Sequence, residues 1–183
     1  MPTSNRIDTM SDCPAPERPL EQNVFDEWPD AVRALFDGSS LGSKTGFTAS
    51  LLTVDTNGHV RTSLLGVGEL YAPDSRTLCI ALWPQARATH AIARSGRAAL
   101  TFVCDEAFYQ AQLLVTPLAG VAGDDSGLAC FHGSIDTAEA QSVRYARLTS
   151  GITFALEGEG EAVLDRWGRQ IEHLKQAAAA AGR

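Results

Sequence analysis

The fold is decided by residues 45–83, TGFTASLLTVDTNGHVRTSLLGVGELYAPDSRTLCIALW. Apolar and β-branched residues gather in three runs within this stretch, at 45–54, 59–71 and 76–83. The turn between the first two runs contains Asn57-Gly58, which tolerates the positive φ angles of a tight hairpin. The second turn is Ala72-Pro73-Asp74-Ser75. Parallel neighbours need a crossover of a dozen or more residues, so these short turns predict an antiparallel meander.

The rest of the chain adds strands and helices around this meander. Further strands are expected at 98–105, 108–120, 127–133 and 151–157. Helices are expected at 24–36, 84–94, 137–148 and 161–180. Six or seven antiparallel strands with peripheral helices predict a mainly β protein built as a small barrel.

Composition limits the domain count and the classes of partner. The chain has 183 residues with a net charge of −7, and 44% of its residues are hydrophobic. Residues 1–22 are rich in Pro, Ser, Asp and Glu and are expected to form a flexible tail, while 23–183 form a single domain ending in a helix. The acidic balance argues against nucleic acid and against an anionic membrane surface, because phosphate neutralisation needs clustered Lys and Arg.

Sequence features also predict where the protein works. No apolar run is long enough to span a membrane, and the first residues lack the apolar stretch of a signal peptide. The four cysteines, at 13, 79, 104 and 130, form no C-x-x-C pair. We therefore expect a reduced, cytoplasmic protein that makes no membrane contact.

The usual catalytic signatures are missing from the sequence. It contains no P-loop, no G-x-S-x-G, no H-E-x-x-H and no G-x-G-x-x-G at a strand-to-helix junction. The four histidines are scattered and none pairs with a second ligand at helical spacing, so no metal site is expected. No catalytic side chain can be assigned from these patterns.

One group of residues points to an anion site. Arg61 lies near the start of the second run, and Arg87, Thr89 and His90 fall in the first turns of the helix that follows Trp83-Pro84. A helix N-terminus carries unpaired N–H groups and the positive end of the helix dipole, so it favours an anion. Two arginines meeting there would hold a phosphate, although single arginines on strands more often only raise solubility.

Four short segments follow one another between about residues 44 and 118: RTSLL (61–65), IALWPQAR (80–87), RAALTF (97–102) and YQ (109–110). They resemble motifs of the pyridoxamine 5′-phosphate oxidase family of flavin-binding split barrels. The family's counterparts are an R-x-x-L-L strand, a phosphate-binding turn ending in Arg-Lys, an N-P-R-A-A-L-L-F strand and an R-Q pair. Each motif is short, so the specificity of the resemblance comes from their order and spacing.

The resemblance implies a six- to seven-stranded antiparallel split β-barrel that binds FMN between the subunits of a homodimer. Arg61 and Arg87 would hold the FMN phosphate. The backbone of Thr62, Ser63 and Leu64, the strand end at Leu82-Trp83, and Gln110 would lie along the isoalloxazine ring. By their residue types alone, Trp83 would equally suit core packing and Gln110 a strand-edge hydrogen bond.

The sequence departs from the family at three places. The Arg-Lys phosphate pair is Arg87-Ala88 here, so Thr89 or the helix N–H groups would have to substitute for the lysine. Gly66 stands where the true oxidases carry a lysine for the substrate phosphate, and no C-terminal Arg-x-His segment is found. Oxidation of vitamin B6 phosphates is therefore not expected.

The resulting function hypothesis is an FMN-dependent oxidoreductase that acts on an unidentified small molecule, with NADH or NADPH as a candidate electron donor. Two alternatives stay open at this point. One is a non-catalytic protein of the same fold that binds flavin, haem or a deazaflavin. The other is a cofactor-free dimeric barrel that serves as an interaction domain.

Overall fold

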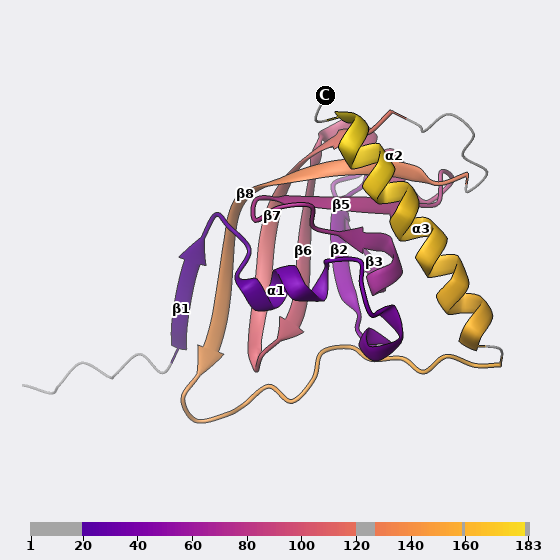
Figure 1. Cartoon of the computed structure of the whole chain (residues 1–183). Helices are drawn as coiled ribbons and strands as arrows, with labels where there is room; N and C mark the ends of the chain where they lie inside the picture. Colours follow the sequence, from indigo (N-terminus) through magenta and orange to yellow (C-terminus); the bar gives the residue numbers. More distant parts are fainter. Residues whose placement is uncertain (1–19, 120–126, 159, 182–183) are drawn as a thin grey trace, which may run out of the picture.

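The structure, a computed structural model, describes residues 20–119, 127–158 and 160–181. Within these ranges, eight strands form one antiparallel sheet, with order β3-β2-β6-β7-β8-β5-β4 and with β1 paired to β8 (Figure 1). The strands are β1 (Leu20–Phe25), β2 (Ala49–Val54), β3 (Val60–Leu65), β4 (Leu70–Tyr71), β5 (Thr77–Leu82), β6 (Arg97–Cys104), β7 (Ala107–Pro117) and β8 (Ala129–Val143). The helices are α1 (Asp30–Leu35), α2 (Arg87–Ser95) and α3 (Gly160–Ala181), with 3₁₀ turns η1 (Leu41–Lys44) and η2 (Val67–Glu69).

The sheet curls because its two edge strands are neighbours in the chain. β3 and β4 lie at opposite ends of the strand order, and the three-residue turn η2 joins them. The predicted run 59–71 is therefore not one strand. Its first part pairs with β2, as the hairpin at Asn57-Gly58 predicts, and its last two residues pair with β5. The predicted mainly β, antiparallel split-barrel fold is confirmed.

The core lies on the inner face of this curled sheet and follows the two-residue period of the strands. On β2, Ala49, Leu51 and Thr53 are buried, whereas Ser50, Leu52 and Val54 face outward. Across the β6–β7 pair, the Phe102 and Tyr109 rings stack with their centroids 5.1 Å apart. Burial of the inner face leaves the alternate residues of β2, β3, β6 and β7 on an outer face.

α3 packs against η2, the turn that joins the two edges of the sheet, and against β5. Figure 1 shows that α3 crosses β5 obliquely. Its Trp167 is 6% exposed and lies against Gly66 and Gly68. A Cβ atom on Gly68 would be 2.2 Å from Trp167 Cγ, so the indole needs a glycine there. Leu174 and Ile171 continue the contact onto Cys79 and Ala81 of β5.

Three further sequence predictions are wrong. Residues 137–143 are not the start of a helix but the end of β8, because they pair with β7 and β1 on either side. The Ala, Glu and Gln residues at 138–141 favour a helix, and sheet pairing overrides that preference. Residues 151–157 form no strand and make one isolated bridge, Phe47↔Thr153. The helix expected at 24–36 is split into the end of β1 and the shorter α1.

The remaining predictions agree more closely with the structure. The helices expected at 84–94 and 161–180 correspond to α2 and α3, and the strands expected at 76–83, 98–105 and 108–120 to β5, β6 and β7. The short strand expected at 127–133 is the beginning of the 15-residue β8. The predicted tail, 1–22, lies outside the described residues except for 20–22, which belong to β1.

Candidate functional site

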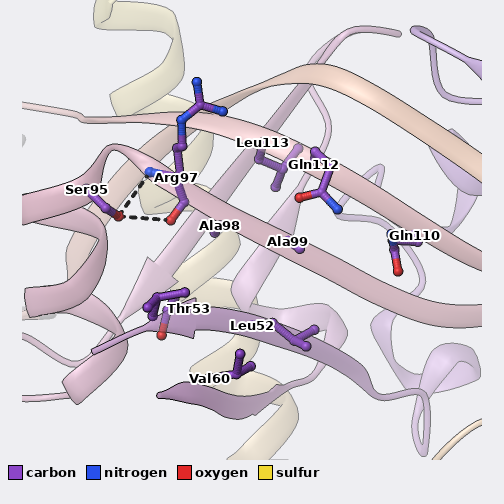
Figure 2. A pocket seen from close by; sticks show the side chains of 11 residues that line it. Leu52, Thr53, Val60, Ser95, Arg97, Ala98, Ala99, Gln110, Gln112 and Leu113 are labelled. Atoms are coloured by element: carbon purple, nitrogen blue, oxygen red, sulfur yellow. Dashed lines mark hydrogen bonds between the residues drawn. The ribbon is translucent and has the colours of Figure 1, made fainter. Parts of the chain in front are cut away.

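A pocket of about 400 Å³ lies on the outer face of the sheet, over β2, β6 and β7 (Figure 2). This volume is within the range of small-molecule sites. Its walls are mainly apolar and include Leu52, Val54, Val60, Ala99, Gln110 and Gln112. The pocket is open on one side, and the first residue of β3 forms part of its rim.

Strand register explains why these side chains meet. Leu52 of β2 is opposite Ala99 of β6, and Ala99 is opposite Gln112 of β7. Side chains of directly opposed residues share a face of the sheet. Thr62 of β3 is opposite Leu52, so it continues the same row toward the sheet edge. The pocket floor is thus a row of small and apolar residues that ends in a carboxamide.

The pocket has few polar groups, and two of them have no partner. Among the described residues, the Gln110 and Gln112 side chains make no hydrogen bond, although each carboxamide offers two donors and an acceptor. The Ser95 hydroxyl is 2.8 Å from the Ala91 carbonyl oxygen, to which it donates. The Arg97 guanidinium is 3.5 Å from Asp136 and points away from Leu52 and Val60 in Figure 2. The site is suited to a planar apolar ligand that has hydrogen-bonding groups on one edge.

The predicted phosphate ligand Arg61 lies beside this pocket, on the other face of β3. Its Nε donates to Asp55 Oδ2 at 2.9 Å. Asp55 also accepts the backbone N–H groups of His59 and Asn57. These hydrogen bonds, that from His59 first, lower the pKa of Asp55 to about 2. Arg61 is therefore held at the β2–β3 turn by a carboxylate that is charged at neutral pH.

The predicted residues around α2 surround a tight turn. The Trp83 carbonyl oxygen accepts hydrogen bonds from the Ala86 N–H at 2.9 Å and from the Thr89 hydroxyl at 2.7 Å. The Thr89 hydroxyl proton is therefore already used in a hydrogen bond within the protein. The Trp83 side chain is 55% exposed, whereas Leu82 is buried in the core. Arg87 is exposed and has no ion pair or hydrogen bond within the described part of the chain. α2 itself packs against β2 and β3.

The structure thus divides the nine predicted residues into groups. Gln110 lines the outer-face pocket, and Thr62 and Leu64 share that face. Arg61 and Ser63 alternate onto the opposite face. Arg87, Thr89, Leu82 and Trp83 lie at the junction of β5 and α2 and do not line the pocket. The shared phosphate role of Arg61 and Arg87 stays a prediction.

The sequence reasoning missed several pocket residues that the two-residue period of a strand could have found. Gln112 lies two residues from Gln110 on the same strand, so both must face the same way. Leu52 and Ala99 follow in the same manner once β2, β6 and β7 are paired.

The described residues hold no group of three or more His, Cys, Asp or Glu placed to bind a metal ion. None of the helices within them has the length and apolar character needed to cross a membrane.

Comparison with known proteins identifies one close relative by sequence. YclD of Bacillus subtilis (strain 168), described as an uncharacterized protein, is 31% identical over 147 residues, which span 80% of this chain and 95% of YclD. No family model matches the chain.

Solved structures similar to this chain are more distant. A Lactobacillus delbrueckii protein provisionally assigned as a pyridoxamine 5′-phosphate oxidase is 14% identical, with a TM-score of 0.49 over 62% of this chain and 94% of its own. An FMN-binding protein of Syntrophomonas wolfei is 14% identical, with a TM-score of 0.40 over 59% and 86%. An F420 reductase is 11% identical, with a TM-score of 0.44 over 60% and 97%.

Proposed function

The chain belongs to the protein family of YclD from Bacillus subtilis, and we propose that it is an FMN-binding flavoprotein, an oxidoreductase that acts on a small molecule. The observation that carries this proposal is the outer-face pocket beside the R-x-x-L-L strand. Its floor is apolar, and two unpartnered carboxamides stand along one wall. Small-molecule sites combine an apolar cavity with a few polar groups in this way.

The residues present fit the ring system of a flavin. The floor at Leu52 and Ala99 is built from small and aliphatic side chains, over which a flat ring can lie. Gln110 and Gln112 offer donors and acceptors for the polar edge of the ring. Among the described residues that line the pocket, Arg97 is the one charged side chain, so nothing there opposes a neutral ring.

Arg61 and Arg87 are the proposed ligands of the phosphate, on the strength of the motif resemblance. Arg87 is free among the described residues, and the first N–H groups of α2 lack intrahelical acceptors. Arg61 still has guanidinium N–H groups besides the Nε that binds Asp55. Thr89 is a weaker candidate, because its hydroxyl proton is already donated to Trp83.

When bound, FMN supplies the hydride or electron transfer, with NADH or NADPH as the proposed donor. The chain's own part is to bind and orient the ring and to exclude water from one of its faces. Among the described residues that line the pocket, none is a carboxylate or a histidine. Cys79 and Cys104 are free thiols, which supports our placing the protein in the reducing cytoplasm.

A homodimer completes the proposed site. The outer face exposes Val54, Val60, Leu64 and Leu114, with exposed fractions of 39–63%. Exposed apolar patches of this kind mark interaction surfaces. A second copy seated on this face would close the open side of the pocket.

The test is flavin binding by the purified chain and by Arg61→Ala and Arg87→Ala. Charge-assisted hydrogen bonds contribute about 1.5–3 kcal/mol each, so each variant should weaken FMN roughly 10- to 150-fold while leaving riboflavin nearly unchanged. Arg169→Ala, an exposed residue of α3, is the control. Fluorescence quenching measures both ligands.

Each alternative gives a distinct result. If the chain binds neither FMN nor riboflavin, the flavoprotein proposal fails and a cofactor-free barrel is favoured. Absorption bands of haem or of a deazaflavin in the purified protein would contradict FMN as the cofactor. Equal loss of FMN and riboflavin in the arginine variants would show that the arginines are structural.

A further inference from the structure

Gln112 has no role in the motif resemblance, yet its position is as close to the pocket as that of Gln110. Both residues line the pocket from β7, and both are half-buried. They are two residues apart on one strand, which separates their Cα atoms by roughly 7 Å. Figure 2 shows the two side chains along the same wall.

The cross-strand neighbours of Gln112 do not pair with its carboxamide. Across the sheet it is opposite Ala99 on one side and Thr137 on the other. No hydrogen bond to it is formed within the described residues. By contrast, Gln141 of β8 donates to Glu139 at 2.6 Å, and Gln22 of β1 donates to the same carboxylate. Gln141 and Gln22 thus share Glu139 as a hydrogen-bond partner. The two glutamines in the pocket have no such partner among the described residues.

We infer that Gln112 is a specificity-determining residue, which acts with Gln110 to select a planar heterocycle carrying an imide edge. This inference rests on the proposed function, because the flavin ring is such a heterocycle. An imide edge presents acceptor, donor and acceptor in a row. Two carboxamides supply the complementary donors and acceptor, since each can donate through its amide nitrogen and accept through its oxygen.

The inference predicts a pattern of binding that differs from that of the arginines. The imide edge is shared by FMN and riboflavin, so Gln112→Leu should weaken both ligands equally, by about two- to tenfold. Haemin lacks an imide edge, so its binding should not fall. Loss of donors at the ring carbonyls should also lower the reduction potential of the bound flavin, because reduction places negative charge there.

The experiment titrates FMN, riboflavin and haemin into the purified full chain and into Gln112→Leu, with Gln112→Asn as a second variant. Asparagine keeps the carboxamide but shortens its reach, so it should fall between the wild type and leucine. Gln176→Leu, on the exposed side of α3, is the matched control. Circular dichroism and urea midpoints show that each variant folds.

The outcomes separate the two levels of the proposal. If the wild type binds flavin and Gln112→Leu binds FMN and riboflavin with unchanged affinity and potential, the inference is overturned and the flavoprotein proposal survives. A loss confined to FMN would also overturn it, because it would assign Gln112 to the phosphate. If the wild type takes up no flavin, the proposed function fails and the inference fails with it.

Discussion

Gly68→Ala tests the contact that joins the two edges of the sheet. The new Cβ would lie 2.2 Å from Trp167 Cγ and 2.4 Å from Cδ1, well inside van der Waals contact. The indole is almost fully buried, so it cannot move aside freely. Overpacking costs about 1–3 kcal/mol, and expulsion of the indole is bounded by the roughly 3–5 kcal/mol of a Trp→Ala change. We expect a loss of about 2–5 kcal/mol in the free energy of unfolding.

Urea denaturation followed by far-UV circular dichroism measures this loss, and Tm should fall by roughly 2–4 °C for each kcal/mol. Gly168→Ala is the matched control, because a Cβ atom there meets nothing within 4 Å. In a helix interior that change should stabilise by about 0.5–1 kcal/mol. In the double variant Gly68→Ala/Trp167→Ala, the alanine should add little to the cost of losing the tryptophan. A free energy of unfolding for Gly68→Ala within 0.5 kcal/mol of wild type would refute the reasoning.

Two further predictions concern Glu69 and the outer face. Burial raises the pKa of Glu69 above 4.5, although the Gly66 N–H and Arg166 oppose the shift. A raised carboxyl pKa favours folding at low pH and costs stability as pH rises through the folded value. Glu69→Gln keeps an acceptor for the Gly66 N–H but carries no charge, so the variant should be more stable than wild type at pH 7 and should lose this advantage near pH 4. Urea midpoints at both pH values test this prediction. A stability difference that does not change with pH would contradict it. Val60→Lys places a charge among the exposed apolar residues of the outer face and should convert the dimer into monomers, which sedimentation measures. Val24→Lys on β1 is the control, because Val24 is equally exposed. A wild-type protein that sediments as a monomer would contradict the dimer proposal.

Local sequence patterns predicted the hairpin, β5, α2 and α3, because turn residues and helical periodicity are short-range signals. They failed where distant pairing decides. Residues 137–143 have a helical composition and become a strand only because β1 and β7 flank them. The break at η2 was missed, and the residue packed against it, Trp167, lies about a hundred residues later in the chain.

One of the nine predicted site residues lines the candidate pocket, and the flavin-binding role of all nine stays a prediction. Gln110 lies in the pocket, and the period of a strand would have added Gln112. The commitment of the Thr89 hydroxyl to Trp83 depends on how the turn folds back, which residue types alone do not specify.

The 15-residue β8 has a consequence for the order in which the protein can assemble. It pairs with β7 along one edge and with both β1 and β5 along the other. β1 and β5, from the first half of the chain, therefore cannot complete their pairing until residues 129–143 are available. A nascent chain that has emerged only through β7 has β1 unpaired and β5 held by the two-residue β4 alone. Such long-range pairing slows folding to milliseconds or longer, and unpaired strand edges invite aggregation. The sheet can therefore be completed only after β8 has been synthesised. Until then, the unpaired strands are exposed and are binding sites for chaperones.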